Sequence, residues 1–522
     1  MLNLDADQVA RLREALGEAG YTHDNVAALL GPMAHRALAR NETVPGLRAT
    51  GGSPAETADR HGSAAGRSPL EVLTRLWPLQ APVPERDLER ALPGLVEPLC
   101  RAGILVRGGD GPEGGRGGGS RGKQEGDMFR ATVDVRPYAD ETHDWWVVSD
   151  LTPGLDGAQA PMDPDHVLGV SSASTSLAQL AVREPVDRAW DLGTGCGVQA
   201  LHLSGHVRDV VATDVNQRAL RMARLTAALN EVAVDVRTGS LFEPVDGERF
   251  DLVVTNPPFV IAPGTGERLV YRDSGLPGDE VVRRVVTGIP EHLTDGGWGQ
   301  VLANWAHVEG TPWTERVEGW LRGLGCDAWV VQREVADPAE YVELWLKDAG
   351  LHGTADYTRR YDAWLTWFAE QRIDGVGFGW VNLRRTGREE LRLEEWPYGV
   401  EQPLGPEVAA WARRTDLLHV PGDLLNRRLV VREDVRQETV GTPGAADPEV
   451  LVLRQQRGMR RARQVDTATA AAVGACDGEL TVGAILDAVA QLLDQPADRI
   501  RTELRNTLRD LGADGFLGED LR

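Results

Sequence analysis

The sequence predicts an α/β protein whose middle part is a doubly wound parallel sheet, with helical, winged-helix-like segments before and after it. Over the middle of the chain, short apolar runs that end at Gly, Asp or Asn alternate with helical stretches, as in DRAWDLGTGCG, DVVATDVN and FDLVVTNPPF. Buried strands separated by helices are typical of parallel sheets. The 522 residues, 42% of them hydrophobic, are enough to form several buried cores.

The charge balance restricts the function. The chain has 56 Lys and Arg against 79 Asp and Glu, a formal net charge of −23. This argues against a protein that holds nucleic acid by an overall positive field, although a local basic groove stays open. Only Lys123 and Lys347 are lysines, so a lysine nucleophile or Schiff base is disfavoured.

The cysteines and the N-terminus indicate the compartment. Cys100, Cys196, Cys326 and Cys476 are scattered and form no ligand cluster, which predicts a reducing environment and no metal site. The N-terminal segment lacks the basic start and apolar core of a signal peptide, and no run approaches the ~18 apolar residues of a membrane span. We therefore expect a cytoplasmic protein that does not act on membranes.

Residues 1–107 are predicted to form a helical, winged-helix-like domain. Asp5 and Gln8 have the spacing of a capping box that begins a helix. Two further helices are expected over 69–80 and 84–103, followed by a short apolar strand. The Gly-rich stretch 108–127 has too few apolar residues to be buried, and we interpret it as a linker or wing tip.

Residues 128–390 are predicted to form the α/β domain. Strands are expected at FRATVDVRPY and WWVVSDL, then along the alternating segments, with helical insertions over 338–348 and 356–371. After about residue 390 the alternation stops. Residues 391–522 are predicted to form a third domain, with a basic segment and a helix–loop–helix–strand end that is again winged-helix-like.

Three motifs follow predicted parallel strands, where open sheets bind ligands. The first, DLGTGCG at 191–197, lets the backbone pass close to a ligand, and its acid suits a cationic amino-acid group better than a phosphate. The second is Asp214, 23 residues after Asp191, where a carboxylate can bind ribose hydroxyls. The third is NPPF at 256–259. Cofactor-binding residues predicted from the first two motifs are Asp191, Gly193, Thr194, Gly195, Gly197 and Asp214.

In this order, the three motifs resemble those of class I S-adenosylmethionine-dependent methyltransferases of the (Asn/Asp)-Pro-Pro-aromatic type. That group includes DNA and RNA adenine-amino, rRNA guanine-amino and release-factor glutamine methyltransferases. The resemblance covers roughly 130–310 and extends weakly to 390. It implies a Rossmann-like, seven-stranded core whose last strand, 378–385, is antiparallel, and S-adenosyl-L-methionine as the cofactor.

The NPPF motif suits methylation of a weakly nucleophilic, conjugated nitrogen. The side-chain carbonyl of Asn256 and the backbone carbonyl of Pro257 can each accept one N–H, which orients the nitrogen lone pair and stabilises developing positive charge. The prolines keep the turn rigid, and Phe259 offers a stacking face. Residues predicted to be catalytic are Asn256, Pro257, Pro258 and Phe259. Two alternatives stay open: Asp214 as a helix cap, and NPPF as a rigid turn in an inactive domain.

Other cofactor contacts are suggested by resemblance alone. Thr175 precedes the first motif where related enzymes place a cofactor-lining loop. Ser240 and Leu241 follow the third strand, where relatives often have an acid that meets the adenine amino group. The sequence departs from that pattern at Ser240, so the adenine contact is left open.

The substrate is predicted to be a macromolecule, with RNA, less so DNA, ahead of protein. The basic segment LRQQRGMRRARQ suggests phosphate contacts by Arg457, Arg460 and Arg461. The same segment can equally be a solvated face that pairs with the abundant acids. Protein glutamine methylation and a non-catalytic, cofactor-binding regulator are the alternatives.

Overall fold

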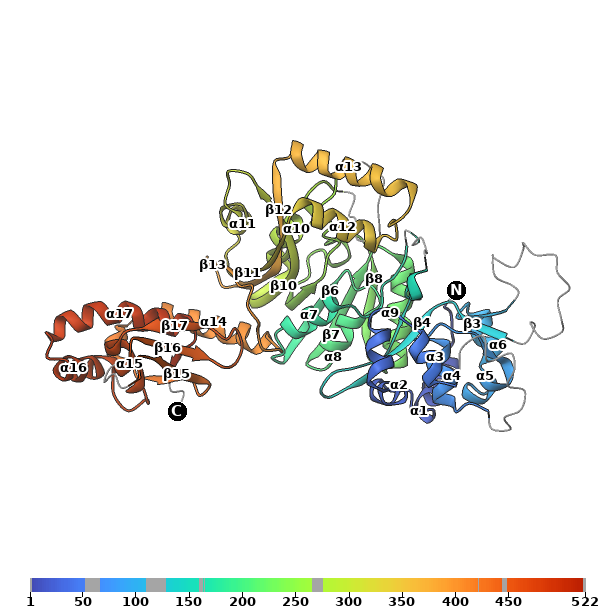
Figure 1. Ribbon diagram of the computed structural model, residues 1–522, viewed down its shortest axis with the longest axis horizontal. Helices are drawn as coiled ribbons and strands as arrows, with labels where there is room; N and C mark the ends of the chain where they lie inside the picture. Colours follow the sequence, from blue (N-terminus) through green and yellow to red (C-terminus); the bar gives the residue numbers. More distant parts are fainter. Residues whose placement is uncertain are drawn as a thin grey trace. The chain divides into compact units, whose positions relative to one another are not determined.

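The computed structural model describes residues 2–51, 66–108, 128–158, 163, 165–264, 276–420, 422–443 and 448–519. The chain forms two compact units (Figure 1). The first comprises Met1–Ala178 and Pro185–Glu394, and the second comprises Gln179–Glu184 and Glu395–Arg522. The predicted Gly-rich linker, apart from Gly108, lies outside the described residues.

An eight-stranded sheet forms the centre of the first unit, in the order β13-β11-β12-β10-β9-β6-β7-β8. Its strands are β6 (Val186–Leu192), β7 (Val207–Asp214), β8 (Val234–Thr238), β9 (Phe250–Thr255), β10 (Leu293–Val308), β11 (Cys326–Ala336), β12 (Ile373–Arg385) and β13 (Leu391–Glu395). Strands β8, β7, β6, β9 and β10 pair in parallel, whereas β12 runs antiparallel to β10 and β11. The predicted Rossmann-like sheet with an antiparallel strand over 378–385 is therefore confirmed, and β13 is an additional edge strand.

Helices lie before and between the strands of this sheet along the chain. They are α7 (Ser172–Leu180), α8 (Val198–Ser204), α9 (Gln217–Leu229), α10 (Glu280–Gly288), α11 (Trp313–Leu321), α12 (Pro338–Asp348) and α13 (Ala355–Glu370). Asp337 caps α12 by accepting a hydrogen bond from the Glu340 amide, and Pro338 occupies its first turn. Helices α12 and α13 form an insertion between β11 and β12, close to the two predicted helical segments.

The N-terminal part of this unit combines helices with a small antiparallel sheet. Its elements are α1 (Ala6–Glu18), α2 (His23–Leu38), α3 (Val44–Ala49), α4 (Pro69–Leu76), β1 (Val83–Pro84), α5 (Glu85–Ala91), α6 (Val96–Arg101), β2 (Leu105–Arg107) and β3 (Met128–Ala131). The predicted capping box is present, because the side chains of Asp5 and Gln8 each accept the other residue's amide. From α4 onward the order of elements, with sheet order β1-β3-β2, is that of a winged helix.

The strand that begins at residue 128 belongs to the small N-terminal sheet. We expected FRATVDVRPY to be one strand of the α/β domain. Instead β3 pairs with β1 and β2, because Phe129 is buried in the N-terminal core. The rest of the segment forms β4 (Asp134–Ala139), which pairs with β5 (Asp144–Ser149).

The N-terminal helices and the sheet domain share one hydrophobic core. Leu12 and Leu16 of α1 belong to the same buried cluster as Leu225 and Leu229 of α9. Polar contacts through the β4–β5 hairpin add to it: the Tyr21 hydroxyl donates to the Val135 carbonyl at 2.9 Å. Helix α9 is therefore covered by residues that precede the whole α/β domain.

The second unit contains helices and two small antiparallel sheets. Its elements are α14 (Gly405–His419), β14 (Leu429–Val431), β15 (Val435–Val440), β16 (Val450–Gln455), β17 (Ala462–Val465), α15 (Thr467–Gly474), α16 (Val482–Leu492), α17 (Ala497–Ala513) and β18 (Leu517–Glu519). The expected helix–loop–helix–strand end is present as α16, α17 and β18. The partner of β18 is β14, which comes before the helices, and β15, β16 and β17 form the other sheet.

Candidate functional site

The glycine loop after β6 leaves open space on one side. Gly193, Gly195 and Gly197 have φ values of +76°, +56° and +87°. A Cβ on Gly197 would come within 3.2 Å of the Ala223 Cα in α9, so this glycine is required by helix packing. A Cβ on Gly193 or Gly195 would meet no atom within 4 Å. The two glycines thus border a space in which a ligand can approach the backbone.

Asp214 ties the glycine loop to the neighbouring strand. It ends β7, which lies beside β6 in the sheet. Its carboxylate accepts hydrogen bonds from the amides of Gly195 at 3.0 Å and Asn216 at 2.8 Å. Burial raises the pKa of Asp214. The side chain stays partly exposed, so it can bind a ligand while holding the loop.

Asp191 is a buried acid directly before the loop. Its side chain accepts a 2.6 Å hydrogen bond from the Thr194 hydroxyl, and the residue is 1% exposed. Burial raises the pKa of Asp191 to about 7, and the nearby charge of Asp214 acts in the same direction. A cationic group placed beside Asp191 would favour its ionised form.

Asn256 follows β9, the strand on the other side of β6. Its Oδ1 atom is buried and has no hydrogen-bond partner in the described part of the chain. Pro257 is buried, Pro258 and Phe259 are half-buried, and the Phe259 ring meets Trp345 edge-on with 6.0 Å between centroids. An unpaired buried acceptor costs about 1–3 kcal/mol, so this carbonyl is available to a donor from a ligand.

The three predicted motifs meet at one edge of the sheet. They follow β9, β6 and β7, three neighbouring parallel strands, and carboxyl ends of such strands form the ligand-binding edge. The order of the strands in space therefore places Asn256, the glycine loop and Asp214 side by side.

Three weaker candidates lie on the segments next to this edge. The Thr175 hydroxyl donates to the Ser172 carbonyl at 3.0 Å, so it already has a partner in its own helix. Ser240 is exposed. Leu241 is half-buried with φ of +47°, an unusual conformation for leucine.

Two residues that sequence reasoning missed lie beside these candidates. The Val215 side chain, next to Asp214, is 63% exposed. The Glu243 carboxylate accepts a hydrogen bond from the Ser240 amide at 3.2 Å, so an acid does stand beside Ser240. An apolar residue directly after the acid of the second motif was the available sequence signal for Val215, whereas Glu243 is brought back by the turn that follows β8.

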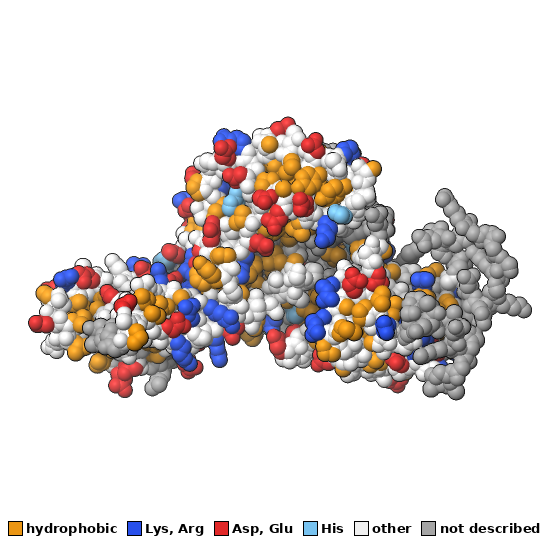
Figure 2. Space-filling view, in the orientation of Figure 1, with side chains coloured by type: hydrophobic (Ala, Val, Ile, Leu, Met, Phe, Trp, Pro, Cys, Tyr) orange, Lys and Arg blue, Asp and Glu red, His pale blue; other side chains and the backbone are white. Residues whose placement is uncertain are grey.

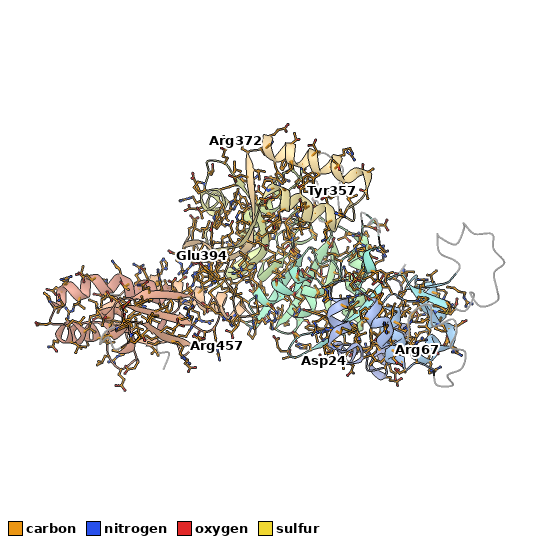
Figure 3. All side chains as sticks on the ribbon, viewed as in Figure 1. Asp24, Arg67, Tyr357, Arg372, Glu394 and Arg457 are labelled. Carbon is orange, nitrogen blue, oxygen red and sulfur yellow. The ribbon has the colours of Figure 1, made fainter. Side chains whose placement is uncertain are left out.

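The basic segment of the second unit does not form one exposed patch. Arg457, labelled in Figure 3, and Arg460 are exposed and have no ion-pair partner among the described residues. Arg461 is only 7% exposed, and its guanidinium lies 4.7 Å from the Trp396 ring centroid. The Arg461 side chain thus packs inside the unit, and its contact with substrate stays a prediction.

Two further arginines of the segment are already paired. Arg454 bonds to Glu438 at 2.7 Å, and Arg463 lies 3.2 Å from Asp514. In the described ranges, no group of three or more His, Cys, Asp or Glu residues could hold a metal ion. Nor does a helix in those ranges have the length and apolarity to cross a membrane.

The fold and this edge agree with the resemblance to class I methyltransferases of the Asn-Pro-Pro-aromatic type. Residues 169–305 match the model of the methyltransferase small domain family. Residues 18–115 match a second family, described as a domain of unknown function, DUF7059. The matched methyltransferase segment contains all three motifs.

The curated relatives that match this segment are named either as protein glutamine methyltransferases or as ribosomal RNA methyltransferases. A ribosomal protein uL3 glutamine methyltransferase of Bradyrhizobium diazoefficiens is 37% identical over 22% of this chain and 39% of its own length. A release factor glutamine methyltransferase of Xylella fastidiosa is 36% identical over 23% and 47%. A ribosomal RNA small subunit methyltransferase C of Klebsiella pneumoniae is 34% identical over 22% and 30%. The matches thus cover less than half the length of each of these relatives, and the predicted resemblance is confirmed for this part of the chain.

Proposed function

We propose that this protein is an S-adenosyl-L-methionine-dependent methyltransferase that acts on a planar amide or amino nitrogen of a macromolecule. The observation that carries the proposal is the buried Oδ1 of Asn256, which has no partner among the described residues and directly follows the strand next to β6. Such an atom suits a site that receives an N–H donor from outside the chain. When bound, S-adenosylmethionine supplies a methyl group made electrophilic by a positively charged sulfur.

The residues around the glycine loop fit that cofactor. The open space at Gly193 and Gly195 admits a ligand against the backbone. Asp214, partly exposed at the end of β7, would accept hydrogen bonds from ribose hydroxyls. Asp191 would face the cationic amino-acid end, and the exposed Val215 side chain offers an apolar surface to a base.

Asn256 would hold the nitrogen that is methylated. Its carbonyl would accept one N–H, and the Pro257 carbonyl the other, so that the nitrogen lone pair points toward the methyl group. Both acceptors also stabilise the positive charge that develops on the nitrogen as the bond forms. The turn is fixed by two prolines and by the contact between Phe259 and Trp345, so the acceptors need no rearrangement.

For the substrate, we favour the side-chain amide of a protein glutamine over an RNA base. Of the five arginines in the basic segment, Arg457 and Arg460 alone are exposed without an ionic partner in the described chain. Figure 2 shows hydrophobic side chains gathered over the α12–α13 insertion, where Leu344 is 49% exposed. Apolar surface suits protein contacts better than a phosphate backbone. Two of the three relatives named above methylate glutamine according to their names.

Transfer of labelled methyl groups tests this proposal. Extract from cells that lack the enzyme is separated into RNA, DNA and protein, and each fraction is incubated with the enzyme and labelled cofactor. We expect the wild-type enzyme to label the protein fraction and the Asn256→Ala variant to leave that fraction unlabelled. Label in RNA alone would restore the RNA hypothesis. Cofactor binding without transfer to any fraction would support a non-catalytic regulator.

A further inference from the structure

The chain directly after NPPF is held by the α12–α13 insertion, whose outer helix carries Tyr357 (Figure 3). Val260, Ile261 and Ala262 are 0%, 0% and 3% exposed. They belong to one buried cluster with residues of the insertion, which include Tyr341 and Trp345. Connections after a strand normally run over the surface, so burial of three consecutive residues beside a catalytic motif requires an explanation.

One oxygen atom joins three elements at this point. The Tyr341 hydroxyl of α12 accepts a hydrogen bond from the Ile261 amide at 2.8 Å and one from Asn304 Nδ2 of β10 at 3.0 Å. Both Tyr341 and Asn304 are fully buried. Burial raises the pKa of Tyr341, so the group stays a neutral phenol. Ile261 is two residues beyond Phe259, so this bond fixes the backbone at the end of the NPPF turn.

A second contact from α12 holds the same turn. Trp345 lies one helical turn after Tyr341, on the same face of the helix, and its ring meets the Phe259 ring edge-on. Asn304 also has a buried Oδ1 without a partner among the described residues, as Asn256 does. Asn256 directly follows β9 and Asn304 lies on the adjacent strand β10. The Tyr341 hydroxyl links the Ile261 amide of the turn to the side chain of Asn304.

We propose that Tyr341 is a positioning residue that holds the NPPF turn in its reactive geometry through Ile261 and Asn304. The inference rests on the proposed methyltransferase activity, but it concerns an insertion outside the segment that matches the methyltransferase small domain family. Without the hydroxyl, the Ile261 amide and the Asn304 side chain are buried donors without an acceptor, and the turn relaxes. Because reaction rates fall steeply with small displacements of positioned groups, this relaxation slows transfer rather than binding.

The test compares Tyr341→Phe with Tyr361→Phe. The first variant keeps the ring that packs against Phe368 and Phe378 and removes only the hydroxyl. The control makes the same chemical change in α13, where the Tyr361 hydroxyl bonds to the exposed Glu343 at 2.9 Å. We expect Tyr341→Phe to lower kcat about tenfold with the KM for S-adenosylmethionine within about twofold of wild type, and Tyr361→Phe to match wild type.

Amide hydrogen exchange gives a readout that needs neither cofactor nor substrate. In the full chain, exchange over 259–262 is expected to be at least about tenfold faster in Tyr341→Phe than in wild type, and unchanged in Tyr361→Phe. Asn304→Ala, which leaves Tyr341 and its bond to Ile261 in place, should accelerate exchange less. If Tyr341→Phe does not fold, the rate of hydrogen exchange over 259–262 in Asn304→Ala tests the positioning role instead.

The two readouts separate the two claims. Unchanged exchange and unchanged kcat in Tyr341→Phe would overturn the positioning role, as would a lower Tm with wild-type kcat. A wild-type enzyme that transfers methyl to no fraction would instead overturn the proposed function, while faster exchange would still support the role of Tyr341 in fixing the turn.

Discussion

The edge of the large sheet and the basic segment of the second unit differ in how far the fold satisfies their polar side chains. At the sheet edge, the side-chain carbonyls of Asn256 and Asn304 are buried and have no partners within the part of the chain that the structure describes. In the basic segment, Arg454 and Arg463 have acidic partners and Arg461 packs on a tryptophan. The sheet edge therefore keeps hydrogen-bond acceptors for a ligand, whereas most arginines of the basic segment are already engaged within the protein.

This difference distinguishes a binding residue from a structural one better than residue type does. An arginine-rich run is a conspicuous pattern, yet exposed ion pairs contribute little and are common. An unpaired buried amide is rare in folded proteins. We therefore consider Asn256 a stronger candidate for binding substrate than the arginines. The following experiments test this comparison, from the largest expected effect to the smallest.

The largest effect is expected from Asn256→Ala. Loss of an acceptor that acts in the transition state should lower kcat at least about 100-fold, while calorimetry should give a cofactor affinity within about twofold of wild type. Asn506→Ala, on the exposed face of α17, is the control for a lost surface amide. A normal rate in Asn256→Ala would remove the basis of the comparison.

Asp214→Ala is expected to act on binding. The variant loses the ribose acceptor and leaves the Gly195 amide without its partner, so cofactor affinity should fall about 10- to 100-fold, in the range of one or two charged hydrogen bonds. Asp209→Ala, on the same strand with a 57% exposed side chain, provides the matched control. Equal affinities in isothermal titration would refute the role of Asp214.

The raised pKa of Asp191 predicts pH dependence of cofactor binding. Its pKa of about 7 means that the carboxylate ionises between about pH 6 and 8, so affinity for a cationic ligand should increase about tenfold over that interval. Asp191→Asn should bind weakly at every pH. A flat profile in wild type would contradict the contact with a cationic group.

Stability without cofactor should depend on pH in the opposite sense. The folded state keeps the Asp191 proton up to about pH 7, whereas in the unfolded chain the carboxyl ionises near its ordinary value of 3.8. Folded protein therefore binds more protons in this window, and Tm should fall as the pH rises from about 4 to 7. Asp191→Asn should lose this contribution, which thermal unfolding across that pH range will measure.

The smallest effects concern the arginines. Arg461→Ala should destabilise the second unit by about 1–2 kcal/mol, because it removes packing on Trp396. The double variant Arg457→Ala/Arg460→Ala should change stability by less than about 0.5 kcal/mol. If the double variant also flattens the salt dependence of RNA binding, the arginines contact phosphates and the RNA hypothesis gains.

The sequence predicted which motifs lie at the carboxyl edge of the sheet because its signals are local. Each motif directly follows its own strand, and the order of strands in a doubly wound sheet then brings Asp191, Asp214 and Asn256 to one edge. The burial of Arg461 had no such signal, since it depends on Trp396, 65 residues earlier in the chain and next to the segment only after folding.

The packing partners of some elements were equally hard to predict. Residues 128–131 have the alternating pattern of any half-buried strand, and only tertiary packing assigns them to β1 and β2. The bond from Tyr341 to Ile261 spans 80 residues. Nothing in the helical pattern of 338–348 distinguishes this tyrosine from the other aromatic residues of the insertion.

The core shared by α1 and α9 has a consequence for how the protein unfolds. Helix α9 begins three residues after Asp214 and packs its apolar face on the N-terminal helices. Loss of those helices exposes Leu225 and Leu229 to water and loosens the helix that follows Asp214. The N-terminal region and the cofactor site should therefore melt as one cooperative transition. A chain shortened at the glycine-rich stretch would lose the integrity of the sheet domain together with its first hundred residues.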